Sequence, residues 1–147
     1  MNTSINKDDY VDLIKELELL NIDNIQKFTF KGLFTPIKII KVIDGDTVKA
    51  VFKFKDTYYK SNFRMTGIDT AEIHSKDENE KKRGFDAKEY VFNILNNKIA
   101  IAEFLDFDKY GRILANIYLD NNELLSDNLI NGGYAQSYDG KTKSAWK

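Results

Sequence analysis

The stretch Ile43-Asp44-Gly45-Asp46-Thr47-Val48 sets the fold, because a turn signal is followed at once by the start of an alternating strand. Asp and Gly are the residues that tight turns select, and on their own they indicate only a turn. The mainly apolar residues 37–43 precede the turn, and apolar side chains recur at every second position after it: Val48, Ala50, Phe52 and Phe54. This pattern predicts two strands joined by a tight turn.

Charged residues suited to phosphate chemistry follow this turn in order. Asp46 and Asp69 are hard oxygen donors that suit a cation of the size of calcium, and Glu72 is a third carboxylate close by. Arg64 and Arg112 each offer a planar, bidentate guanidinium, and the predicted strands bring the second arginine back beside the first. One metal, one base and two arginines are a set that can cleave phosphate esters.

With these residues in this order, residues 36–139 resemble the staphylococcal nuclease (thermonuclease) family. The resemblance implies that Asp46 and Asp69 hold Ca²⁺ and that Thr70 contributes its backbone carbonyl. It also implies that Glu72 acts on the attacking water. The chain departs from the family's pattern at Ala71, where proline is usual, in a longer segment between Asp46 and Arg64, and in a C-terminus short for the last helix.

The resemblance also supplies expectations for substrate binding. Arg64 and Arg112 match the two arginines that clamp the phosphate, and Lys109 and Tyr110 match a pair that contacts a terminal phosphate. Tyr138 faces either the core or the ligand, and we take it as a substrate-binding candidate. The joint occurrence of these motifs, with strand patterns between them, carries the hypothesis, because each motif alone is common in ordinary turns.

Composition limits the classes of protein and site. With 147 residues, of which 42% are hydrophobic, we expect one folded core. There is no cysteine, so disulfides and thiolate metal sites are excluded. A metal would therefore sit on oxygen or on His74, and we expect His74 to be solvated because hard cations prefer oxygen.

The charge is divided unevenly along the chain. The net charge is -1, but residues 1–26 hold six acids and two bases and leave 20 bases and 17 acids to the remainder. The first part is thus -4 and the remainder +3. A mildly positive body favours an enzyme that binds nucleic acid transiently over a protein that coats it tightly.

The N-terminal segment predicts a helical extension over residues 1–30. A helix capped by Asp8 or Asp9 and ending near Asn21 has apolar residues at helical spacing, and we expect it to pack one face on the body rather than to bind a partner. Three phenylalanines, Phe28, Phe30 and Phe34, are expected to be core or staple residues rather than a platform for stacking bases. Neither a signal peptide nor an apolar run of about 20 residues is visible, which predicts a soluble, intracellular protein without a membrane span.

The rest of the chain predicts an α+β, mainly β, fold. Strands are expected at residues 58–68, 99–104 and 113–119, in addition to the first two, with a surface loop at residues 73–83. Helices are expected from Gly84 or Phe85 to Asn97 and over residues 124–130, the second ended by Gly132-Gly133. This order is that of an OB-fold five-stranded barrel with two packed helices, assigned to residues 31–147.

The hypothesis from the sequence is a Ca²⁺-dependent nuclease. It would cleave DNA and RNA and, by resemblance, leave 3'-phosphate and 5'-hydroxyl ends. Because attack needs an accessible in-line phosphate, we expect it to prefer single strands, and we expect a monomer. The alternative is a catalytically inactive OB-fold module that binds single-stranded nucleic acid. Such a module would be expected to lack one or more of Asp46, Arg64, Glu72 and Arg112, and all four are present.

Overall fold

Five strands close into a β-barrel in the computed structural model, which describes residues 5–141 and residue 146. They are β1 (Phe34–Asp44), β2 (Thr47–Phe54), β3 (Thr57–Met65), β5 (Ile99–Phe107) and β6 (Ile113–Tyr118). Their order around the barrel is β1-β2-β3-β6-β5, and only the β3–β6 pair among these is parallel. This mixed barrel with associated helices confirms the predicted α+β OB-type architecture.

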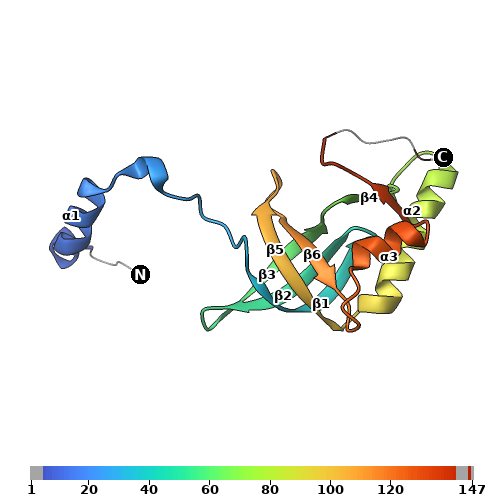
Figure 1. Cartoon of the computed structure of the whole chain (residues 1–147), viewed down its shortest axis with the longest axis horizontal. Coiled ribbons are helices and arrows are strands. Elements are labelled where there is room, and N and C mark those ends of the chain that lie inside the picture. Colours follow the sequence, from blue (N-terminus) through green and yellow to red (C-terminus); the bar gives the residue numbers. More distant parts are fainter. Residues whose placement is uncertain (1–4, 142–145, 147) are drawn as a thin grey trace.

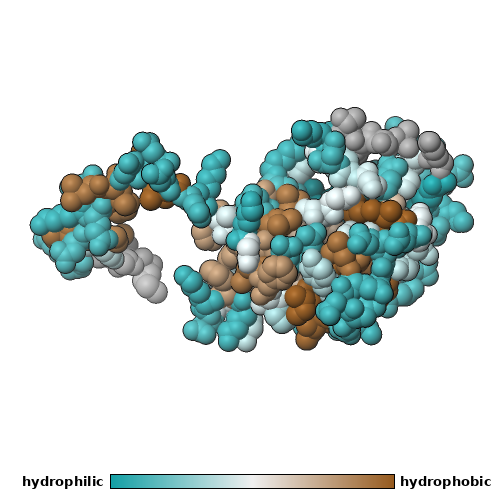
Figure 2. Space-filling view, in the orientation of Figure 1, coloured by the Kyte–Doolittle hydropathy of each residue, from teal (hydrophilic) through white to brown (hydrophobic). Residues whose placement is uncertain are grey.

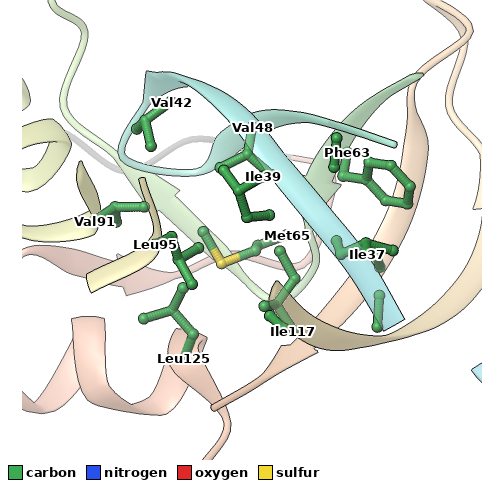
Figure 3. Packing of buried hydrophobic residues seen from close by; sticks show 14 of the residues in the cluster. Ile37, Ile39, Val42, Val48, Phe63, Met65, Val91, Leu95, Ile117 and Leu125 are labelled. Atoms are coloured by element: carbon green, nitrogen blue, oxygen red, sulfur yellow. The ribbon is translucent and has the colours of Figure 1, made fainter. Parts of the chain in front are cut away.

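The core lies inside the barrel and continues under the helices that close one end (Figure 3). Alternate residues of the strands point inward, as the period of two predicts, so Ile39 and Phe63 are fully buried. Helix α2 (Glu78–Leu95) contributes Val91 and Leu95, and helix α3 (Leu125–Asn131) contributes Leu125. The helices therefore fix that end of the barrel rigidly against the strands that carry the turn at Asp44.

The predicted third strand proves to be two strands. β3 ends at Met65, and Gly67 takes a φ of 79°, a conformation that ends an extended segment. The chain then forms β4 (Ile68–Thr70), which pairs with β7 (Ala135–Ser137) in a separate two-stranded sheet. The prediction of one strand over residues 58–68 was wrong because apolar alternation does not reveal this glycine's backbone conformation.

The polar loop predicted over residues 73–83 is also shorter than expected. α2 begins at Glu78, because the side chain of Asp77 accepts hydrogen bonds from the N–H groups of Asn79 and Glu80. Gly84 is buried inside this helix, where a Cβ would lie 2.7 Å from the carbonyl oxygen of Ala71. The polar composition misled the prediction, since these residues form the exposed start of a helix.

The second predicted helix agrees closely with the structure. α3 is capped by Gly132, and the following Gly133 has a φ of 79°. Tyr134, which follows, stacks on Tyr90 of α2 with ring centres 4.4 Å apart. The glycine pair thus returns the chain towards β7 and the rim of the barrel.

The N-terminal helix stands apart from the barrel (Figure 1). It consists of a 3-10 turn, η1 (Lys7–Tyr10), and helix α1 (Val11–Leu19), followed by η2 (Ile22–Asn24), and no residue of the three is buried. The expectation that this helix packs one face on the body was therefore wrong. Phe30, rather than α1, covers the core on this side. The centre of its ring lies 5.4 Å from that of Phe52 and 4.9 Å from that of Phe54.

Of the three phenylalanines expected as core or staple residues, Phe30 packs against the core, and Phe28 contacts the rings of Phe30 and Phe107. Phe28 is 77% exposed and Phe34 is 58% exposed, the latter stacking on Tyr118 at the barrel surface. His74 is exposed, as expected. No helix among the described residues combines the length and apolar character needed to cross a membrane.

Candidate active site

A cavity of about 1010 Å³ lies on the outer face of the barrel, where the β1–β2 turn, the end of β3 and β4 meet the turn before β6. The described tail after β7 forms another wall. All nine residues singled out from the sequence line this cavity: Asp46, Arg64, Asp69, Thr70, Glu72, Lys109, Tyr110, Arg112 and Tyr138. Residues that are up to 92 positions apart are thus brought to one place by the barrel's topology.

The turn at the end of β1 is fixed by close packing and by its own hydrogen bonds. The Asp46 N–H donates to the Asp44 carboxylate at 3.1 Å. A Cβ on Gly45 would lie 2.7 Å from the Cβ of Ala87 in α2 and 2.9 Å from a methyl of Thr70. Glycine is therefore required at position 45 for space, which lets α2 and β4 approach the turn.

Asp46 and Asp69 face the same guanidinium. Arg64 Nη2 lies 3.3 Å from Asp46 Oδ2 and 3.6 Å from Asp69 Oδ1, and the three side chains are almost fully buried. The Arg64 guanidinium also donates to the backbone carbonyls of Met65 and Ile68. These contacts hold the arginine at the point where β3 turns into β4, with both carboxylates directed at it.

The Asp46 carboxylate is bound from several sides. Its Oδ2 accepts hydrogen bonds from the Thr70 N–H at 3.3 Å and from the Thr70 hydroxyl at 3.1 Å, and its Oδ1 accepts from the Thr47 hydroxyl at 2.9 Å. β4 is thereby tied to the β1–β2 turn. Asp46, Asp69 and Thr70 thus lie at one junction of three strands.

The pKa values of the two aspartates in the turn, Asp44 and Asp46, are shifted in opposite directions. Burial, together with the hydrogen bond and negative charge of Asp46, raises the pKa of Asp44 from 3.8 to about 7. Burial alone would raise the pKa of Asp46, but hydrogen bonds from Asp44 and Thr47 and the charge of Arg64 outweigh it and lower that pKa below 3.8. Asp46 therefore ionises first as pH rises, and Asp44 keeps its proton to higher pH.

The donor chemistry fits a hard divalent cation. Asp46 and Asp69 are 7% and 3% exposed and both face Arg64, so two buried carboxylates, the donors that hard cations prefer, are directed at one place. The Thr70 carbonyl belongs to the same strand end. Within residues 5–141, no three Asp, Glu or His side chains form a preformed metal cluster, so the donors that fit are two carboxylates with backbone and solvent oxygens.

The second arginine is oriented by a carboxylate that the sequence analysis did not single out. Asp108 Oδ2 accepts from Arg112 Nε at 2.5 Å, while Asp108 Oδ1 accepts from the backbone N–H groups of Tyr110 and Arg112 at 2.8 and 2.9 Å. Gly111 completes the turn with a φ of 82°. Burial acts to raise the pKa of Asp108, but the hydrogen bonds and charge of Arg112 and the Tyr110 N–H outweigh it and lower that pKa below 3.8.

The candidate substrate-binding residues lie at the mouth of the cavity. Tyr110 is 71% exposed, and its ring has Lys109 Nζ at 5.2 Å and Arg112 Cζ at 5.4 Å from the centroid. Tyr138 is held by its N–H, which donates to the Gly67 carbonyl at 2.9 Å. Glu72 is exposed and lines the cavity, six residues before the first residue of α2. This arrangement puts a carboxylate, two tyrosines and a lysine around an entrance to the buried carboxylate–arginine centre.

Sequence reasoning therefore missed Asp44 and Asp108 as parts of the site. Both precede a glycine within a short turn, and an aspartate in that setting commonly accepts backbone N–H bonds. That signal was available for both residues. The side chain that such an aspartate orients, and the shift of its pKa, depend on contacts in the folded chain that the sequence does not display.

A five-stranded OB-type barrel with a buried carboxylate–arginine centre on its outer face defines the class of this protein. The chain belongs to the staphylococcal nuclease homologue family, whose sequence pattern matches residues 62–146. The matched range contains every candidate site residue except Asp46, which precedes it. Family membership supports a nuclease-type or nucleic-acid-binding function.

The sequence is similar to those of two relatives over about two thirds of this chain. An uncharacterised protein of Methanocaldococcus jannaschii is 34% identical over a match that covers 69% of this chain and 58% of the relative. A protein named thermonuclease from Staphylococcus hyicus is 31% identical over 68% of this chain and 57% of the relative. The chain thus spans somewhat more than half the length of these relatives.

Proposed function

We propose that this protein is a Ca²⁺-dependent phosphodiesterase that cleaves DNA and RNA within the cavity. The observation that carries the proposal is the placement of Arg64 between Asp46 and Asp69, with Arg112 and Glu72 lining the same cavity. This combination provides a cation site, two fixed positive groups and a base around one space.

The cation site would consist of Asp46, Asp69 and the Thr70 carbonyl. Bound there, Ca²⁺ would supply Lewis-acid polarisation of a phosphoryl oxygen. The low pKa of Asp46 keeps this carboxylate ionised at neutral pH, which is the form that binds a cation.

Each remaining residue has a separate task in the reaction. Glu72 accepts a proton from the water that attacks phosphorus, and Arg64 and Arg112 donate to the oxygens on which negative charge grows. The bond from phosphorus to the 5'-oxygen breaks, and that oxygen takes up a proton. The products are a 3'-phosphate and a 5'-hydroxyl. Lysine would not reproduce the planar, two-point contact of either arginine.

A flexible strand suits this cavity better than a stiff duplex. Attack requires the water, the phosphorus and the leaving 5'-oxygen to lie in one line at the buried centre. An unpaired strand can rotate its backbone to reach this geometry. We therefore propose a preference for single strands of DNA or RNA. A non-catalytic nucleic-acid-binding module is the competing function, and it requires binding without cleavage.

The test is digestion of a single-stranded DNA oligonucleotide by the purified chain, with Ca²⁺ and then with EGTA in excess, with the product ends determined by mass spectrometry. The proposal predicts fragments that end in 3'-phosphate and begin with 5'-hydroxyl, formed only with Ca²⁺. Fragments with 5'-phosphate would refute the assigned bond cleavage. Binding of the intact oligonucleotide without any fragment would favour the non-catalytic module.

A further inference from the structure

Five exposed lysines share the outer face of three neighbouring strands. This lysine face comprises Lys38 and Lys41 of β1, Lys49 and Lys53 of β2, and Lys60 of β3. The strand register brings them together. Lys41 of β1 lies opposite Lys49 of β2, and Val51 of β2 lies between Lys38 of β1 and Lys60 of β3. Residues directly opposite one another in antiparallel strands point to the same side of the sheet.

Along the lysine face, the three strands carry no acid before Asp44, the last residue of β1. Residues 37–43, 47–54 and 57–65 contain neither aspartate nor glutamate. Among the described residues, only Lys53 of the five is bridged, to Asp56 at 3.9 Å at the tip of the hairpin. Like charges directly opposite each other, as at Lys41 and Lys49, destabilise a sheet, so a bound anion would relieve a repulsion that the fold leaves in place.

The lysine face continues directly into the cavity. Along β3, the side chains of Tyr58, Lys60, Asn62 and Arg64 alternate to the same side, and Arg64 lines the cavity. Arg64 lies six positions after Tyr58 along the strand, a span of about 20 Å at roughly 3.3 Å per residue. At a spacing of about 3.4 Å per stacked nucleotide, about six nucleotides of a single strand would fit along this span.

An aromatic side chain ends the lysine face at its far side. Tyr58 is 70% exposed, and Lys53 Nζ lies 5.6 Å from the centre of its ring. Hydrophilic residues gather at this free end of the β2–β3 hairpin (Figure 2). An exposed ring beside a lysine offers a base both a stacking surface and a phosphate contact, the two elements that proteins use to hold single strands.

We propose that the lysine face binds the phosphate backbone of a single-stranded polynucleotide that extends out of the cavity, with Tyr58 stacking on a base at the far end. For the position of the scissile phosphate, this inference rests on the proposed function. It adds a binding site outside the cavity, which selects long single strands over short fragments by contacting several further phosphates.

The test compares two doubly substituted full chains, Lys49→Gln/Lys60→Gln and the control Lys15→Gln/Lys27→Gln. Each removes two positive charges, and all four lysines are exposed. Binding of fluorescent thymidine oligonucleotides of about 2 and about 12 nucleotides is measured in EGTA over a range of salt concentrations. EGTA separates binding from cleavage. Each lost phosphate contact should reduce the slope of log affinity against log salt by about 0.7, so the first variant should lose about 1.4 on the long oligonucleotide.

The short oligonucleotide should bind the wild type and the first variant equally, and the control should match the wild type on both. An unchanged slope for the first variant, an equal loss in the control, or no preference of the wild type for the long oligonucleotide would each overturn the inference. The proposed function fails separately. If the first variant has a reduced salt slope but the wild type shows no Ca²⁺-dependent cleavage, the lysine face binds the strand and the proposed phosphodiesterase activity is refuted. If the wild type cleaves but the slope of the first variant is unchanged, the proposed activity stands and the lysine face is refuted.

Discussion

Arg64 reaches Asp46 across the junction of β3 and the β1–β2 turn, with Nη2 at 3.3 Å from Oδ2. The arginine is 9% exposed and donates to two backbone carbonyls as well, so its guanidinium plane is set before any substrate arrives. Preorganised donors of this kind act without reorganisation when charge develops on a phosphate.

Replacement of either arginine by lysine should lower turnover steeply while the charge is kept. Loss of one preorganised donor typically costs a factor on the order of 10² to 10³, because a point charge cannot make the planar, two-point contact. Steady-state kinetics of Arg64→Lys and Arg112→Lys on single-stranded DNA would measure this loss. Turnover close to that of the wild type in either variant would remove that arginine from the phosphate clamp.

Asp108→Asn should lower turnover through Arg112 and should also destabilise the turn. The pKa of Asp108 is lowered in the folded chain, so its stabilising contribution is present above the unfolded value of 3.8 and is lost as pH falls through the folded value. The difference in unfolding free energy between wild type and variant should therefore be larger at about pH 7 than at about pH 3. Urea unfolding at both pH values measures it, and a difference that grows in acid would contradict this account.

Gly45→Ala should destabilise the fold by about 1 to 3 kcal/mol, the usual cost of an extra methyl in a filled space. The added Cβ would meet Ala87 at 2.7 Å and Thr70 at 2.9 Å. Because the conflict involves Ala87, the substitution Ala87→Gly should cost less in the Gly45→Ala background than in the wild type. Urea unfolding of the four chains gives this coupling, and strictly additive costs would show that the close approach is not the cause.

Deletion of residues 1–26 should leave nuclease activity measurable. None of η1, α1 and η2 contributes a buried residue, and the deletion keeps Phe30, which covers the core. Circular dichroism would establish that the shortened chain folds, and digestion of single-stranded DNA would test it. A folded but inactive shortened chain would show that the extension takes part in the site.

The sequence predicted the barrel well because its signals are local. The alternation after Val48 and the turn at Gly111 each reflect a period or a backbone conformation that a short stretch specifies. It failed where the outcome depends on tertiary contacts. The break between β3 and β4 depends on pairing with β7, and the early start of α2 depends on the cap at Asp77 and the fit of Gly84 against Ala71.

The candidate site shows the same division. The residue types and their order predicted which side chains would share a cavity, and the structure brings all nine to one. The raised pKa of Asp44 and the hydrogen bond from Arg112 to Asp108 arise from burial and from contacts between neighbours in space. Such effects follow from the folded surroundings, so a pattern of residue types does not specify them.

The most direct test of the phosphodiesterase is the dependence of turnover on Ca²⁺ for the wild type and for Glu72→Gln. The amide keeps the shape of the side chain and loses its basicity, so Ca²⁺ should reach half-maximal effect at a similar concentration in both. We predict no turnover in EGTA for either chain. At saturating Ca²⁺, we predict a maximal rate about 10² to 10⁴ times lower for the variant. Full activity of the wild type in EGTA, or an unchanged maximal rate in Glu72→Gln, would contradict the account.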